Sequence, residues 1–120
     1  MKVLHLNLKK KWYDMIASGE KKEEYREVKE YWISRLVGEF TAPYQHEPFN
    51  FIYRGLKHGM WSPVGFDVVE FKNGYAKDAP TMTVKIRGID IEYGKEEWGA
   101  EHGKTYFVIK LGEILERSPF

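Results

Sequence analysis

The stretch that decides the fold is VLHLNLKKKWYDMIASGEKKEEYR, residues 3–26. Apolar side chains recur through its first six residues, and this pattern predicts a strand over 3–8. The apolar residues within 12–16 have helical spacing, and Gly19 can end that helix because glycine readily adopts a left-handed conformation. The charged residues 22–26 are predicted to be extended. The stretch therefore predicts a strand, a helix and a further strand in succession.

The rest of the chain adds one helix and several strands. Apolar residues at i, i+3, i+4, i+7 and i+8 predict a helix over 28–36. Strands are predicted at 66–72, at 82–91 and at 106–111, where Phe107, Ile109 and Leu111 share one face. Gly88 shifts the apolar alternation by one residue, which indicates a β-bulge. This order of elements favours an α+β fold with a curved sheet or a small barrel.

Length and composition indicate one globular domain, residues 1–120. Charged residues make up 31% of the chain but nearly cancel, at a net charge of +1. Any nucleic-acid binding must therefore come from a local basic patch. The chain has no cysteine, which excludes disulfides, thiolate metal sites and a cysteine nucleophile and fits a cytoplasmic protein.

Other segments point away from a membrane, a metal or a cofactor. The apolar run at the N-terminus is too short for a signal peptide, and no stretch approaches the ~20 apolar residues of a membrane span. The four histidines have no metal-ligand spacing, and no phosphate-binding glycine motif is present. We therefore expect neither a membrane association nor a metal or cofactor.

Residues 39–65 are rich in proline and aromatic residues, and a short strand at 49–54 is possible within them. Cationic side chains mixed with rings suit single-stranded RNA. The alternative to RNA binding is a structural role, in which the rings bury a long loop, and we favour this role slightly. The basic-aromatic group of this segment consists of Arg54, Lys57 and His58 with Tyr53 and Trp61.

Lysines 9–11 fall in the first turn of the first predicted helix. Cations there cost a few tenths of a kcal/mol, because the helix N-terminus already carries partial positive charge. One interpretation is that Lys9 and Lys11 hold an anion together with the N–H groups of that turn. A solvated helix start is an equal alternative, since surface lysines are common.

Lys21 lies in the turn after this helix, where its side chain can point into a cleft. A lysine acts as a base or nucleophile only when burial or nearby cations lower its pKa. Lys22 and Arg26 can supply such cations, whereas Glu23 and Glu24 oppose the effect. A solvated run of charges is the plainer alternative.

A glycine-flanked loop near residue 98 carries a second group of candidates. Trp98 can stack on a base, or it can cap the end of the core, and we weigh the two equally. Glu97 is a candidate acid, with Glu96 and Glu101 as neighbouring alternatives.

Several of these segments together resemble the ASCH domains of the PUA-like superfamily, in particular the small proteins of bacteria and phages. The resemblance brackets nearly the whole chain and implies a small β-barrel flanked by helices, with a cleft proposed to bind RNA. The segments that carry it are Leu6-Asn7-Leu8, Trp12 to Ile16, Ser18 to Lys21, Arg26, Glu97-Trp98-Gly99 and Tyr106 to Gly112.

The resemblance also implies possible chemistry. One subgroup resembles an amidohydrolase that removes the acetyl group of N4-acetylcytidine with a lysine, a threonine and a glutamate, and another has been assigned ribonuclease activity. Lys21 matches the lysine, and Glu97 is the candidate for the acid. Glu24 occupies the place of the threonine, and a carboxylate does not supply the same neutral hydroxyl.

Three functions follow as hypotheses. The first is binding of RNA or a nucleotide in a basic cleft, with contacts from Lys9, Lys11, Lys21, Arg26 and Trp98. The second is hydrolysis of a modified nucleoside or RNA, with Lys21, Glu24 and Glu97 as catalytic residues. The third is a protein-interaction module that kept the fold without the chemistry.

Overall fold

The structure is a computed structural model that describes residues 1–37 and 65–119. The possible strand at 49–54 and the basic-aromatic group around Arg54, Lys57 and His58 lie outside the described residues. No helix in the described part of the chain is long and apolar enough to cross a membrane.

The described residues form an α+β structure with one mixed five-stranded sheet. The strand order is β1-β3-β4-β5-β2, with β1 parallel to β3 and β3 antiparallel to β4. The predicted α+β class is therefore confirmed. The elements are β1 (Val3–Leu8), α1 (Lys10–Ala17), β2 (Glu23–Glu27), α2 (Glu30–Leu36), β3 (Val68–Asn73), β4 (Thr81–Tyr93), the 3-10 helix η2 (Glu96–Trp98) and β5 (Thr105–Ser118).

The predicted strand, helix and strand at the N-terminus are confirmed. Gly19 follows α1 with φ of 86°, a conformation that an L-residue adopts only under strain. α2 begins two residues later than the spacing predicted. Val28 is buried but precedes the helix, and Lys29 is extended. Helical spacing of apolar residues indicates which positions are buried. The predicted helix therefore included Val28, although the backbone there is not helical.

β4 runs without a break through Gly88. Met82 and Val84 are buried before this residue, and Ile89 is buried after it. The buried positions therefore change from even to odd numbers, in agreement with the shifted alternation in the sequence. The bulge that would produce this shift stays a prediction.

β5 is longer than predicted, because it continues to Ser118. The prediction of one apolar face was incomplete, since Tyr106 and Val108 are buried as well as Phe107 and Ile109. Tyr106 and Val108 form a buried cluster with Tyr25 and Ala100. Alternation along a strand cannot reveal that both faces are covered, because the cover comes from other segments.

The described residues divide into two compact units, and each is considered by itself. The first unit contains residues 1–24, 65–88 and 109–119, and the second contains 25–37 and 89–108. The boundary in β4 falls at Gly88, where the apolar alternation shifts. The expectation of a single domain stays a prediction.

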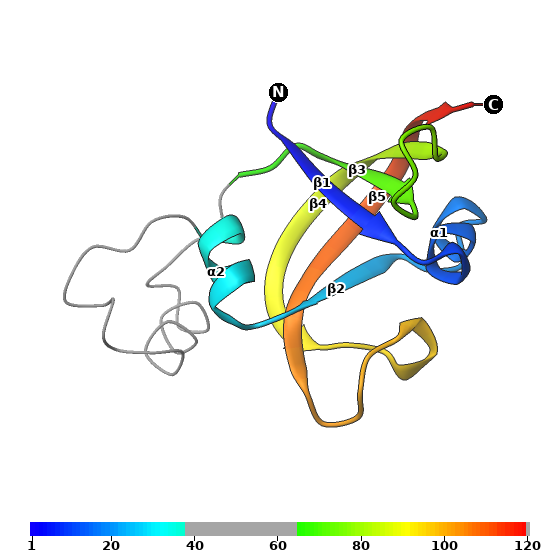
Figure 1. Cartoon of the computed structure of the whole chain (residues 1–120). Coiled ribbons are helices and arrows are strands. Elements are labelled where there is room, and N and C mark those ends of the chain that lie inside the picture. The colour runs from blue at the N-terminus through cyan, green and yellow to red at the C-terminus, as the bar shows by residue number, and fades with distance from the viewer. Residues whose placement is uncertain (38–64, 120) are drawn as a thin grey trace. The chain divides into compact units, whose positions relative to one another are not determined.

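The core of the first unit lies between α1 and the sheet. α1 follows β1 directly and contacts both β1 and β3 (Figure 1). Tyr13 and Ile16 are the buried residues of the helix. Leu4, Leu6 and Phe71 are buried on the strands. This packing fixes the position of the turn that follows α1, and that turn carries Lys21.

Candidate functional site

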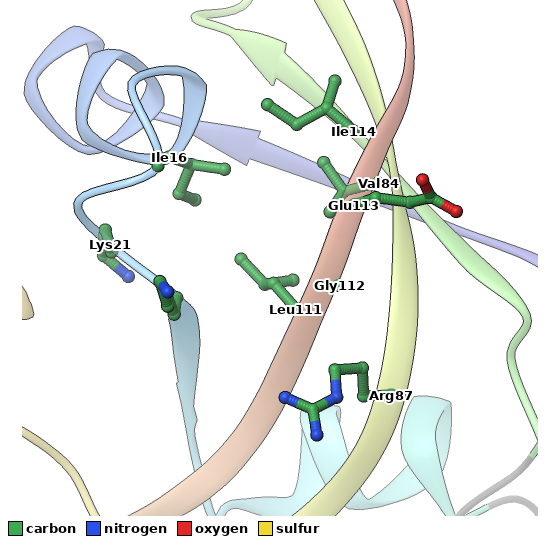
Figure 2. Close-up of a pocket in the computed structure, with 10 residues that line it drawn as sticks. Ile16, Lys21, Val84, Arg87, Leu111, Gly112, Glu113 and Ile114 are labelled. Carbon is green, nitrogen blue, oxygen red and sulfur yellow. The ribbon is translucent and has the colours of Figure 1, made fainter.

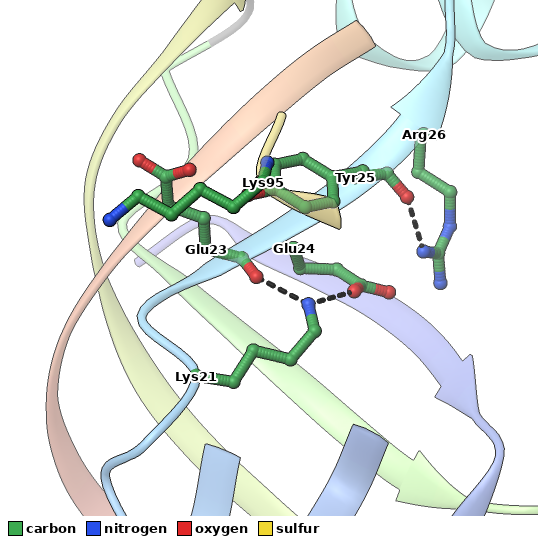
Figure 3. Close-up of polar contacts among 6 residues, drawn as sticks. All are labelled: Lys21, Glu23, Glu24, Tyr25, Arg26 and Lys95. Atoms are coloured by element: carbon green, nitrogen blue, oxygen red, sulfur yellow. Dashed lines mark hydrogen bonds and ion pairs between the residues drawn. The ribbon is translucent and has the colours of Figure 1, made fainter. Parts of the chain in front are cut away.

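Lys21 is a buried cation in the turn between α1 and β2. None of its side chain is exposed, and its backbone N–H donates to the carbonyl of Met15 at 2.9 Å. The ammonium Nζ donates to the backbone carbonyl of Glu23 and to the carboxylate of Glu24 at 2.8 Å (Figure 3). The sequence predicted Lys21 and Glu24 as site residues, and the structure brings them into direct contact.

The Lys21–Glu24 pair is almost completely removed from water, with 6% of the Glu24 side chain exposed. Removing two charges from water costs several kcal/mol for each ion, which the attraction and the hydrogen bonds between them must offset. Such a pair is weak evidence for a role in stability. A neighbouring carboxylate also favours the charged form of an amine, so it opposes the nucleophilic role considered for Lys21.

Trp12 connects two of the predicted lysines. The ammonium of Lys11 lies 4.6 Å from the centroid of its ring, and that of Lys21 lies 5.7 Å from it. Both distances are within the range of cation–π attraction. From the sequence, Trp12 was expected to be an apolar helix residue within an ASCH-like segment, and no regular spacing links it to Lys21.

An open cavity of about 420 Å³ lies beside Lys21 in the first unit (Figure 2). Apolar side chains from α1, β4 and β5 form much of its wall. Cationic side chains, one glutamate and two glycines complete it. The lining residues are Ile16, Gly19, Lys21, Lys22, Val84, Arg87, Leu111, Gly112, Glu113 and Ile114.

Arg87 and Lys22 give this cavity its positive charge. In the described part of the chain, neither side chain has an ion-pair partner. Figure 2 shows the carboxylate of Glu113 directed away from Leu111 and Lys21. Because Glu24 already balances Lys21, the net charge at the cavity is positive and comes from Lys22 and Arg87.

Gly112 leaves space for Arg87 on the neighbouring strand. A Cβ atom at position 112 would lie 3.2 Å from the Cγ of Arg87 and 3.4 Å from the carbonyl oxygen of Lys85. A side chain there would push against the arginine. Neither Gly112 nor Arg87 was a site candidate from the sequence, because Arg87 resembles any outward residue of an alternating strand.

Lys9 and Lys11 lie at the start of α1, and both are exposed. Neither lines the cavity. Lys10, which lies between them, forms an exposed ion pair with Asp14 at 2.5 Å. This pair offsets part of the cost of lysines at a helix N-terminus. Anion binding by Lys9 and Lys11 stays a prediction.

The remaining candidates belong to the second unit. Arg26 donates to the carbonyl of Tyr25 at 2.8 Å (Figure 3). Its guanidinium carbon lies 5.2 Å from the ring centroid of Trp32. Glu97 is exposed in η2. Glu97 and Lys21 belong to different units, so their joint action in one site stays a prediction.

Trp98 packs against the buried cluster of the second unit, which contains Tyr25 and Tyr106. The ammonium of Lys95 lies 4.5 Å from the centroid of the Trp98 ring. The hydroxyl of Tyr25 accepts the backbone N–H of Lys95 at 2.9 Å, and that of Tyr106 accepts the N–H of Glu101 at 3.0 Å. These contacts match the packing alternative for Trp98, while base stacking by Trp98 stays a prediction.

Within residues 1–37 and 65–119, no three histidine or acidic side chains gather closely enough to hold a metal ion. No family model, no curated protein and no solved structure matches the chain. The resemblance to ASCH domains therefore stays a prediction that depends on the sequence segments alone.

Proposed function

We propose that this protein binds a nucleotide, either free or within single-stranded RNA, at the cavity of the first unit, and that it is an ASCH-like domain of the PUA-like superfamily. The observation that carries the proposal is a cavity of about 420 Å³ that combines an apolar wall with the cations Lys22 and Arg87. Ligand sites typically enclose about 300–1,000 Å³, so this volume favours a small ligand.

The two kinds of lining residue suit the two parts of a nucleotide. A guanidinium offers a planar fork of donors that matches phosphate oxygens, and a lysine adds a point charge. Arg87 and Lys22 would hold the phosphate in this way. Ile16 and Leu111 would cover the apolar faces of the base. The Lys21–Glu24 pair would fix the turn that carries Lys22.

Calorimetric titration with uridine and cytidine monophosphates at low salt tests this proposal. We expect binding that weakens as salt rises, because phosphate contacts release counterions. The double variant Lys22→Ala/Arg87→Ala should lose at least about tenfold in affinity, since charged hydrogen bonds are worth about 1.5–3 kcal/mol each.

The control is Lys2→Gln/Lys77→Gln, which removes two exposed charges of the same unit that do not line the cavity. Its affinity should equal that of the unchanged protein. Absence of binding at low salt, or equal affinity in both double variants, would refute the proposal.

A second candidate is hydrolysis of a modified nucleoside at the same cavity. Its motive is the buried Lys21–Glu24 pair, of which Lys21 lines the cavity, because perturbed ionisable groups often mark functional sites. In this candidate Lys21 would be the base or nucleophile, and it would act only after losing its proton, a step that the neighbouring Glu24 carboxylate opposes.

Incubation with N4-acetylcytidine and with RNA, followed by mass spectrometry, tests this second candidate. Lys21→Met should abolish turnover, whereas Lys2→Gln/Lys77→Gln should retain it. Turnover that persists in Lys21→Met, or no turnover of either substrate by the unchanged protein, would exclude the catalytic role.

A further inference from the structure

Two aromatic side chains of α2 stand at the surface of the second unit. The rings of Tyr31 and Trp32 meet edge to face, with centroids 4.8 Å apart and planes at 87°. Tyr31 is 58% exposed. An exposed ring of this size is a large apolar group that its own helix does not bury. Single-stranded nucleic acids use such rings as stacking platforms.

Two arginines flank this ring pair. The guanidinium carbons of Arg26 and Arg35 each lie 5.2 Å from the ring centroid of Trp32, and that of Arg35 lies 5.7 Å from the ring centroid of Tyr31. Arg26 also donates to the carbonyl of Tyr25 at 2.8 Å, and Arg35 donates to the hydroxyl of Tyr31 at 3.3 Å. Ring contact and hydrogen bond together hold each guanidinium in one place.

A guanidinium held against a ring suits phosphate recognition for two reasons. Its side chain loses little further conformational entropy on binding, and its rigid fork of donors matches phosphate oxygens. Both arginines contact one indole, so their guanidinium carbons lie within roughly 10 Å of each other. A stacked strand rises about 3.4 Å per nucleotide. The two arginines are therefore separated by no more than about three nucleotides of such a strand.

We propose that Arg26, Tyr31, Trp32 and Arg35 form a contact surface for single-stranded nucleic acid in the second unit. This surface extends the proposed function and is independent of the cavity in the first unit. The arginines contact phosphates, and the exposed ring of Tyr31 stacks on a base. Arg26 was predicted as a contact residue, but its aromatic and cationic neighbours on α2 were not.

Two acidic residues are close in sequence to this surface. Glu27 is 3.5 Å from the ammonium of Lys104. Glu30 is exposed and is adjacent to the exposed Lys29. An acidic peptide would use the two arginines but would leave the Tyr31 ring without a flat partner. The combination of rings and guanidinium groups therefore favours a nucleic acid over an acidic protein segment.

Fluorescence anisotropy with a short labelled oligouridine tests this surface on the full chain. Arg26→Gln/Arg35→Gln should weaken binding and reduce the slope of log affinity against log salt by about 0.7 for each lost phosphate contact. Tyr31→Ala should lose about fivefold or more. Tyr31→Phe should lose less than Tyr31→Ala, because the ring remains and only the hydrogen bond from Arg35 is removed. Lys2→Gln/Lys77→Gln is the charge-matched control.

The same variants are titrated with uridine monophosphate, the ligand proposed for the cavity. Unchanged mononucleotide affinity in the α2 variants supports two separate sites.

If the α2 variants bind oligouridine like the control while Lys22→Ala/Arg87→Ala does not, the surface is refuted and the cavity proposal stands. If mononucleotide does not bind but oligouridine binding depends on Arg26 and Arg35, the cavity proposal fails and the surface stands. Equal competition by polyglutamate and oligouridine would refute nucleic-acid recognition.

Discussion

At Lys21 the protein encloses a cation and a carboxylate with almost no access to water. Removing one partner of a buried pair leaves an uncompensated charge, which typically costs about 3–5 kcal/mol. We expect Glu24→Gln to lower the free energy of unfolding by an amount in this range, measured by urea denaturation. Asp14→Asn breaks the exposed pair with Lys10, and its effect should stay below about 1 kcal/mol. Equal effects of the two changes would contradict this prediction.

Tyr13 is a second residue whose environment has a measurable consequence. Burial raises the pKa of Tyr13 above 10.0, and Asp14 adds to the increase while Arg117 opposes it. The unfolded chain therefore loses this proton at a lower pH than the folded protein. The stabilisation from Tyr13 is complete below pH 10.0 and is lost as the pH rises through the raised pKa.

Urea unfolding on both sides of pH 10.0 measures this effect. The stability of the unchanged protein should fall more with rising pH than that of Tyr13→Phe, which has no group to titrate at this position. A parallel decline in both proteins would show that Tyr13 does not contribute.

At the level of elements, the loop between β4 and β5 is fixed by a close approach at Gly94. A Cβ atom there would lie 2.6 Å from the Cβ of Ala100 and 2.9 Å from the ring of Tyr25. We expect Gly94→Ala to destabilise the protein by about 1–3 kcal/mol, because the loop must move away from the ring. Thermal and urea unfolding measure this change.

Gly88 provides the matched control within β4. A Cβ atom at this position would have no neighbour within 4 Å. Gly88→Ala should therefore leave stability unchanged or raise it slightly, since alanine restricts the unfolded chain more than glycine does. A loss at Gly88 as large as that at Gly94 would show that crowding is not the cause.

At the level of the whole molecule, β4 and β5 each contribute residues to both units. Neither unit can keep all its strands if the other unfolds, so we expect one cooperative transition. Tryptophan fluorescence can follow each unit separately in variants that retain only Trp12 or only Trp98. The two urea curves should coincide, and separate midpoints would show that the units unfold independently.

The sequence by itself determined the local elements of this protein. Alternation predicted β1, helical spacing predicted α1, and Gly19 predicted the turn that ends the helix. These features depend on neighbouring residues, so a linear pattern contains them. The starts of α2 and β3 were placed two residues early, and the end of β5 was placed too soon, because burial and backbone conformation do not change at the same residue.

Only the tertiary structure decided how the candidate site is built. Lys21 and Glu24 are close in sequence, yet their burial depends on the segments that cover them. Arg87 reaches the cavity from β4, next to Gly112 on β5, and pairing of distant strands places the two together. Spacing along the chain indicates which side chains of one segment are buried together, whereas charge pairing and cavity shape depend on which segments meet. The sequence therefore determined the elements and the candidate lysine, and the folded chain determined its partner and the cavity beside it.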